Sequence, residues 1–167
     1  SRSVEGPIVR ETYADLYDRA RQVSTALLED GVKMGDRVAT LAWNSGRHME
    51  IWFGAMGIGA VLHMVNTRLL PEQIAWIIND AGATLLFAAP EFAPLLAKLT
   101  PHLRHVTTIV YMTDAAHMPV VLPGPVLAEV RCYEQLVACE SPTFDWPALY
   151  ERRASSLCYT SGTTGHP

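Results

Sequence analysis

The sequence predicts an α/β protein with a mostly parallel β-sheet flanked by helices. Short apolar runs alternate with helical stretches of roughly ten residues, and strands joined by helical crossovers run parallel. Apolar residues make up 49% of the chain and charged residues 18%, which is enough apolar material for a buried core. A length of 167 residues fits one domain.

The first element is expected to be a helix over residues 12–30. Apolar side chains recur at helical spacing from Tyr13 to Leu28, which gives the helix one apolar face. Thr12 occupies the N-cap position, and Asp15 completes a capping box. Gly31 is the expected end of the helix.

The following elements alternate between strands and helices. Pro71 begins one of these helices and Gly82 follows it, in the order typical of helix ends. The expected strands are 37–43, 61–65, 84–89 and 106–112, and the expected helices are 48–59, 71–80 and 92–99.

Toward the C-terminus the pattern is less regular. Residues 113–125 are rich in proline and are expected to form a loop, as are residues 141–147. Residues 133–139 are predicted to form a short helix between these loops. Residues 155–159 form the last predicted strand, which leads into a tail rich in Gly and Thr.

Composition and charge argue against several classes of protein. Thirteen basic and 17 acidic residues give a net charge of −4, without the basic stripe of nucleic-acid-binding proteins. The longest apolar stretch, 51–65, is shorter than the ~20 residues of a transmembrane helix, and no signal peptide opens the sequence. Three cysteines are too few for a disulfide framework and are typical of free thiols in a reducing compartment. We expect a protein of the cytoplasm, or one peripheral to a membrane, with no nucleic-acid partner.

Several residue types that often carry chemistry are assigned structural roles. His102 and His105 have HxxH spacing, but Cys132 and Cys139 are too far apart for a typical zinc site. Cys158 lies in an apolar strand and is expected to be a buried, inert thiol rather than a nucleophile.

Other conspicuous residues are expected to belong to the core. His63 lies in a predicted strand and is expected to be a buried, hydrogen-bonded histidine. Three glycines at 54, 57 and 59 match neither GxxxxGK[ST] nor GxGxxG, so we expect close helix packing there. The tryptophans expected in the core are Trp43, Trp52 and Trp76.

The tail after the last strand carries the most specific motif. It reads YTSGTTGHP over residues 159–167, and no Lys follows Gly165, so it is not a Walker A loop. Gly162 and Gly165 let backbone N–H groups approach an anion closely, and the Ser and Thr hydroxyls add neutral donors. Such a loop can wrap a polyphosphate, and a Thr hydroxyl can reach a phosphate-bound Mg²⁺. By composition alone, a flexible linker is the alternative.

This tail closely resembles the phosphate loop of the adenylate-forming (AMP-binding) enzymes, whose signature is YTSGTTGxPKG. Residues 12–16 and 31–39 also resemble the opening of that family, TYxEL followed by GVxxGDRVA. Four stretches (44–53, 59–63, 66–69 and 71–74) are similar to fatty-acyl-CoA ligases in particular, although Thr67 stands where that group often has Pro.

The resemblance implies that residues 1–167 are an N-terminal fragment of the AMP-binding domain, with its phosphate loop at 159–167. The C-terminal remainder of the large domain is then absent, because members of the family are much longer. No catalytic residue is expected within 1–167, and the fragment alone is expected to be inactive.

The function implied by the resemblance is ATP-dependent ligation of a fatty acid to coenzyme A. A carboxylate and ATP give an acyl-adenylate, and the thiol of coenzyme A then gives a thioester. The implied cofactors are ATP, Mg²⁺ and coenzyme A, with Thr160 as the Mg²⁺ ligand. A homodimer stays open, because some relatives dimerise through the N-terminal domain. The implied phosphate-binding residues are Thr160, Ser161, Gly162, Thr163, Thr164 and Gly165.

Two alternatives remain at this point. The ligase could act on another carboxylic acid that is short-chain, sulfur-containing or aromatic. From a different class, the chain could be a non-catalytic α/β module that binds phosphates.

Overall fold

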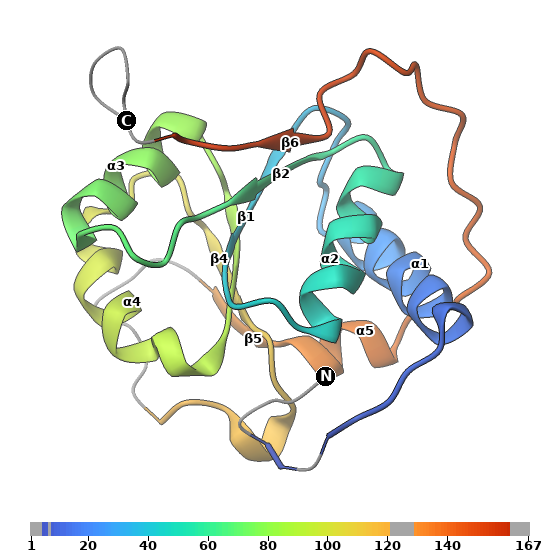
Figure 1. Ribbon diagram of the computed structural model, residues 1–167, viewed down its shortest axis with the longest axis horizontal. Coiled ribbons are helices and arrows are strands. Elements are labelled where there is room, and N and C mark those ends of the chain that lie inside the picture. Colours follow the sequence, from blue (N-terminus) through green and yellow to red (C-terminus); the bar gives the residue numbers. More distant parts are fainter. Residues whose placement is uncertain (1–4, 7, 121–128, 161–167) are drawn as a thin grey trace.

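A parallel β-sheet forms the centre of the molecule, with helices on both sides (Figure 1). The computed structural model describes residues 5, 6, 8–120 and 129–160. In this part of the chain the strand order is β5-β4-β3-β1-β2-β6, and every pair of neighbours is parallel. The predicted α/β class with a mostly parallel sheet is confirmed.

Strands and helices alternate along the chain as the sequence indicates. The strands are β1 (Arg37–Leu41), β2 (Val61–Met64), β3 (Leu85–Ala88), β4 (Thr108–Tyr111), β5 (Glu129–Cys132) and β6 (Ser156–Leu157). The helices are α1 (Tyr13–Glu29), α2 (Gly46–Gly57), α3 (Pro71–Ala81), α4 (Ala93–Leu99) and α5 (Tyr133–Ala138), with short 3-10 turns at Pro90–Phe92, Thr100–His102 and Ala115–His117.

The strand order reverses at β1. The crossover through α2 places β2 on one side of β1, and the crossover through α3 then places β3 on its other side. Reversals of this kind leave a crevice outside the carboxyl ends of the strands, which is where parallel sheets bind ligands.

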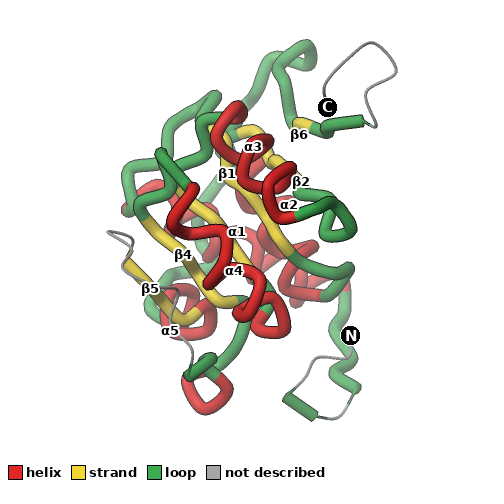
Figure 2. The backbone as a smooth tube through the Cα atoms, turned by 90° about the vertical axis from the view of Figure 1, so that its left-hand side faces the viewer, coloured by secondary structure: helices red, strands yellow, loops and turns green. Residues whose placement is uncertain are grey.

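The two faces of the sheet support two separate cores (Figures 1 and 2). Helices α3 and α4 pack on the face that carries Ala39 and Leu86. Helices α1, α2 and α5 pack on the opposite face, which carries Val38 and Phe87. Adjacent residues of each strand therefore face opposite cores, as the pleat of a strand requires.

Helix ends follow the local signals. Thr12 caps α1, and its N–H donates to the Asp15 carboxylate at 2.8 Å, so the predicted capping box is confirmed. Pro71 begins α3, and Gly82 ends it in the left-handed conformation, with φ 65°. No helix within the described ranges combines the length and apolar character that crossing a membrane requires.

Helices α1 and α2 approach closely at Gly54, which confirms the predicted packing role of this glycine. A Cβ atom at this position would lie 2.8 Å from the Ala20 carbonyl oxygen and 2.7 Å from a Val23 methyl group. The Ser24 hydroxyl donates across the same contact to the Gly54 carbonyl at 2.8 Å.

The segment 139–155 returns from α5 across α1 and α2 to the far edge of the sheet (Figure 1). The indole N–H of Trp146 donates to the Ser24 hydroxyl at 2.7 Å, and the Gln22 side chain donates to the Glu140 carbonyl at 2.7 Å. We call residues 139–155 the return segment.

The structure corrects three expectations. Strand β5 was not predicted, because its sequence EVRC has no apolar run. Trp43 and Trp76 are half-exposed rather than core residues, whereas Trp52 is partly buried against the α1/α2 side. Cys158 is exposed rather than buried, because β6 ends at Leu157 and is an edge strand.

Candidate functional site

Two places bring polar side chains together at the sheet, namely the chain leaving β6 and the crevice beyond β1, β3 and β4. The first belongs to the predicted phosphate loop. Thr160 lies three residues after β6 and is exposed. The other predicted loop residues, Ser161, Gly162, Thr163, Thr164 and Gly165, lie outside the described part of the chain.

Tyr159, the first residue of the motif, is held by side chains of β2 and α3. Its hydroxyl donates to the Asp80 carboxylate at 2.6 Å. Its ring centre lies 5.2 Å from that of His63 and 6.0 Å from that of Trp76, the latter edge-on. Burial, together with the Asp80 carboxylate, raises the pKa of Tyr159 to about 12, so the hydroxyl keeps its proton.

His63 lies in the middle of β2 and is fully buried. Its strand neighbours in register are Ala39 of β1 and Leu157 of β6. Among the described residues neither ring nitrogen has a hydrogen-bond partner, so the expected hydrogen-bonded histidine is buried but not hydrogen-bonded. Burial lowers the pKa of His63 to about 4, which keeps the ring neutral at physiological pH.

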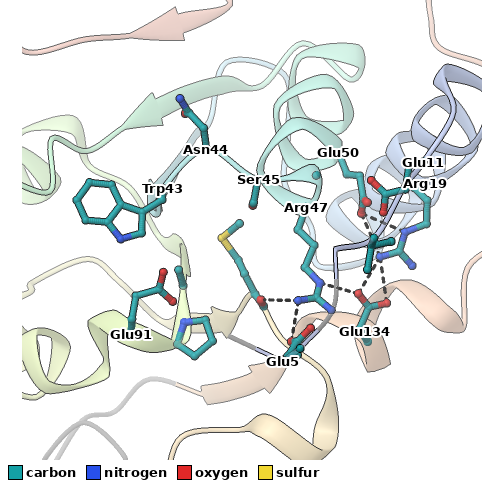
Figure 3. A pocket seen from close by; sticks show the side chains of 16 residues that line it. Glu5, Glu11, Arg19, Trp43, Asn44, Ser45, Arg47, Glu50, Glu91 and Glu134 are labelled. Carbon is teal, nitrogen blue, oxygen red and sulfur yellow. Dashed lines mark hydrogen bonds and ion pairs between the residues drawn. The ribbon is translucent and has the colours of Figure 1, made fainter. Parts of the chain in front are cut away.

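The second place is a crevice of about 760 Å³ outside the carboxyl ends of three strands (Figure 3). Its walls include residues 43–45 after β1, residues 89–91 after β3, and Met112 after β4. It therefore coincides with the reversal in strand order between β1 and β3.

Arg47 links the N-terminal segment to α5 at this crevice. It donates to Glu5 at 2.7 Å, to Glu134 at 2.7 Å and to the Met112 carbonyl at 3.1 Å. Burial alone would raise the pKa of Glu5, but hydrogen bonds from Arg47 and Thr113 lower it to about 2. This carboxylate is therefore ionised throughout the physiological range.

Arg19 continues the ion-pair network toward Glu50 (Figure 3). It donates to Glu50 at 3.1 Å and to Glu134 at 3.0 Å. Glu50 also accepts the Tyr133 hydroxyl at 2.6 Å, and it is 1% exposed. Burial, followed by the charge of Glu50, raises the pKa of Tyr133, so this phenol remains a donor.

The crevice is poorly suited to polyphosphate. Its two arginines are both occupied by carboxylates, and the acidic side chains that line it outnumber them. The acidic residues of the lining are Glu5, Glu11, Glu50, Glu91 and Glu134.

The remaining metal candidates fit structural roles. His102 and His105 are both exposed, as expected for solvated histidines rather than zinc ligands. Within the described residues the search for ligand clusters finds Glu5, Asp114 and His117, with ligand atoms within 4.8 Å of one another. The His117 ring is hydrogen-bonded to Asp114 at 2.7 Å, and Glu5 is held by Arg47, so these groups satisfy one another.

Sequence reasoning selected Tyr159 and Thr160 but not the residues that hold them. Asp80 and Trp76 lie on a helix whose sequence marks only its ends and its apolar face. The charged pairs of the crevice join residues far apart in the chain, with 42 positions between Glu5 and Arg47 and 87 between Arg47 and Glu134. Such pairings carry no local signal.

Comparison with known proteins identifies relatives across the whole chain. The family model described as "AMP-binding enzyme" matches residues 3–167. The chain is 42% identical to a 3-methylmercaptopropionyl-CoA ligase of Ruegeria pomeroyi, over 99% of this chain and 30% of that protein. It is 40% identical to a long-chain-fatty-acid–CoA ligase of Thermus thermophilus, over 100% of this chain and 28% of that protein.

Solved structures agree with the sequence comparison. A crystal structure of the anthranilate CoA ligase AuaEII in complex with anthranoyl-AMP matches with a TM-score of 0.76 and 27% identity. The match covers 92% of this chain and 27% of that one. The chain thus spans about 30% of the length of the curated relatives that it matches.

Proposed function

Because the chain belongs to the AMP-binding enzyme family, we propose that it forms part of an ATP-dependent acyl-CoA ligase. In the proposed reaction a carboxylate attacks the α-phosphate of ATP and pyrophosphate leaves. The thiol of coenzyme A then attacks the acyl carbon of the acyl-adenylate, and AMP leaves as the thioester forms.

One observation carries the proposal. The YTSGTTG sequence begins at Tyr159, two residues beyond the end of a parallel edge strand, in a chain that matches the family over residues 3–167. The position suits phosphate binding, since ligands of parallel sheets bind beyond the carboxyl ends of the strands. Residues 160–165 would hold the β- and γ-phosphates through backbone N–H groups and hydroxyls.

Thr160 fits the Mg²⁺ role that we propose for it. Its side chain is exposed, it offers a neutral oxygen ligand of the kind Mg²⁺ accepts, and Tyr159 beside it is anchored. Bound Mg²⁺ would neutralise phosphate charge. Thr160 would then orient the nucleotide, which is a contribution through position rather than covalent chemistry.

The acid substrate is proposed to be a medium- or long-chain fatty acid. A second candidate, the sulfur-containing acid 3-methylmercaptopropionate, is favoured by the identities of 42% and 40% to two 3-methylmercaptopropionyl-CoA ligases. A fatty-acid substrate is supported by identities of 36% and 40% to a medium-chain and a long-chain fatty-acid–CoA ligase.

The test is acid-dependent exchange between ATP and labelled pyrophosphate in the full-length protein. Acids from short to long are screened together with 3-methylmercaptopropionate and an aromatic acid. Exchange with one class of acid identifies the substrate. No exchange with any acid contradicts the ligase and leaves the non-catalytic phosphate-binding module. Residues 1–167 alone are run in parallel, and we expect no exchange from them.

A matched pair of variants tests the role of Thr160. Thr160→Val removes the hydroxyl at constant shape and should raise the KM for MgATP about 10- to 100-fold, as expected for a lost bond to a charged group. Thr107→Val, just before β4 and four strands away from β6 in the sheet, should leave this KM unchanged. Equal effects of the two variants would contradict the assignment.

The proposal also includes a cytoplasmic location and leaves a homodimer to be tested. Light scattering on the full-length protein measures the oligomeric state, and cell fractionation measures the location.

A further inference from the structure

We propose that Tyr159 is a positioning residue for the phosphate loop, anchored by Asp80 and seated against His63 and Trp76. These contacts set the direction in which the chain leaves β6 and so place Thr160. The inference rests on the proposed function, because it concerns the same loop.

Main-chain pairing ends before the loop begins. Strand β6 is two residues long, and its register joins only Ser156 to Leu62 and Leu157 to His63. No ladder partner in the described chain extends to Tyr159 or Thr160. The direction of the chain at the start of the loop therefore depends on side-chain contacts.

Helix α3 supplies two of these contacts from one face. Trp76 and Asp80 are four residues apart, so their side chains lie on the same side of the helix. Trp76 meets the Tyr159 ring edge-on, and Asp80 accepts its hydroxyl at 2.6 Å. Two separated points of contact fix both the tilt and the depth of the phenol ring.

The residues that contact Tyr159 are themselves attached to the core of the sheet. Helix α3 buries Ile74, Ile77 and Ile78 in the same core against which Tyr159 packs. The side chains around Tyr159 are therefore held in a fixed position relative to the sheet. They can fix the direction of the chain at the start of the loop.

His63 supplies the third contact and is an unusual residue for its place. It is fully buried, and its two ring nitrogens have no partner within the part of the chain that the structure describes, whereas buried polar groups are nearly always hydrogen-bonded. An apolar residue of similar size would avoid this penalty. Local rules of this kind are broken mainly at functional sites, and the ring of His63 faces the first residue of the loop at 5.2 Å.

The protonation states suit a fixed anchor. The Tyr159 hydroxyl donates to the Asp80 carboxylate, and burial lowers the pKa of His63 to about 4, so the imidazole stays neutral at physiological pH. The charged group that faces Tyr159 from α3 is Asp80, which accepts the bond.

The effect of this anchor should be specific to the nucleotide. A loop that starts in the wrong direction must be reordered when ATP binds, and that reordering weakens binding. In the proposed function, the loop contacts the phosphates of ATP. We therefore expect a change in the KM for MgATP without a matching change in the other constants.

The experiment uses the full-length protein and four variants. Tyr159→Phe and Asp80→Ala each break the bond and should raise the KM for MgATP about fivefold. The double variant should show no further increase, because both changes remove the same bond. Tyr13→Phe is the matched control, since Tyr13 is 89% exposed, and should leave the constants unchanged.

Three kinetic results would overturn the inference. They are an unchanged KM for MgATP in Tyr159→Phe, additive effects in the double variant, and an equal loss in every kinetic constant. The last result would indicate a general loss of structure rather than positioning.

A spectroscopic measurement keeps this test separate from that of the proposed function. The protein is labelled with 3-fluorotyrosine, and Tyr159→Phe assigns the ¹⁹F signal of Tyr159 by its disappearance. Asp80→Ala should change the chemical shift of that signal, because the Tyr159 hydroxyl loses its acceptor, and no change would show that the anchor does not form. A wild type that forms the anchor but neither exchanges pyrophosphate nor binds MgATP would instead contradict the proposed function, and the positioning role with it.

Discussion

Glu50 and His63 are both buried beside the central strands, on opposite faces of the sheet, but their surroundings differ. Glu50 is 1% exposed and accepts hydrogen bonds from Tyr133 at 2.6 Å and Arg19 at 3.1 Å. His63 is 0% exposed, and neither of its ring nitrogens has a partner in the described chain.

We interpret the difference as that between a polar group that stabilises the fold and one whose proposed role is functional. A buried network stabilises a fold when every member is paired, and Glu50 joins α1, α2 and α5 in this way. An unpaired buried group weakens the fold. His63 contacts Tyr159 at the start of the proposed phosphate loop, and the positioning role proposed for Tyr159 accounts for His63 where stability does not.

The largest change in the free energy of unfolding is expected when the buried Glu50 network is broken. Glu50→Ala leaves the Tyr133 hydroxyl and the inner side of Arg19 without their acceptor, and it should lower the free energy of unfolding by about 3 kcal/mol. Urea unfolding measures the change. Glu91→Ala, an exposed carboxylate of the same crevice, should change it by less than about 0.5 kcal/mol. Similar values for the two variants would show that the network adds no stability.

The pH dependence of the free energy of unfolding tests whether His63 is buried in its neutral form. The pKa of His63 is lowered from 6.5 to about 4, so between these values the unfolded chain binds more protons than the folded chain. The free energy of unfolding should therefore decrease as the pH is lowered, by about 2 kcal/mol for this residue between about pH 7.5 and pH 5.

His63→Leu is the variant that isolates this contribution. Urea unfolding at both pH values should give a smaller loss of stability on acidification than in the wild type. The pKa of His48 is also lowered by burial, but that residue is present in both proteins and its effect cancels. Glu5, with a pKa lowered to about 2, loses its contribution mainly at lower pH. Equal slopes for variant and wild type would contradict a neutral buried His63.

The smallest changes in the free energy of unfolding are expected for two buried tyrosines. Tyr133 donates its hydroxyl to Glu50, whereas the buried Tyr111 hydroxyl has no partner among the described residues. Tyr133→Phe should lower the free energy of unfolding by about 1 kcal/mol, and Tyr111→Phe should leave it unchanged or raise it slightly. Thermal unfolding of the two variants measures which one is less stable. A less stable Tyr111→Phe would contradict the difference between a paired and an unpaired buried hydroxyl.

Much of the fold could be predicted because its signals are local. The Thr12 and Asp15 capping box marks the start of α1, and Pro71 and Gly82 bound α3. The start of α2 was placed two residues late, although Ser45 is a typical N-cap and accepts from the His48 N–H.

Strand β5 was missed for a physical reason. It is an edge strand of four residues, and its pattern includes Glu129 and Arg131. Edge strands need no continuous apolar run, because only part of their surface is buried. Strand β1 was predicted two residues too long for a related reason, since Trp43 lies beyond the sheet at the rim of the crevice.

The candidate site was predicted only in part. The motif identified Tyr159 and Thr160, but nothing in the sequence relates Tyr159 to Asp80, 79 positions earlier. The unpaired state of His63 depends on how β1, β2 and β6 pack around it. Tertiary contacts of this kind leave no periodic pattern in a single sequence.

The return segment has a consequence for the order of folding. Its hydrogen bonds join residues 118 and 122 positions apart, from Gln22 to Glu140 and from Ser24 to Trp146. Closing so long a loop carries an entropic penalty, which favours docking after α1 and α2 have already paired. During synthesis these helices leave the ribosome well before Trp146 does. Strand β6 lies at the far end of the return segment, so the chain that leaves β6 reaches its place only after α1 and α2 have paired.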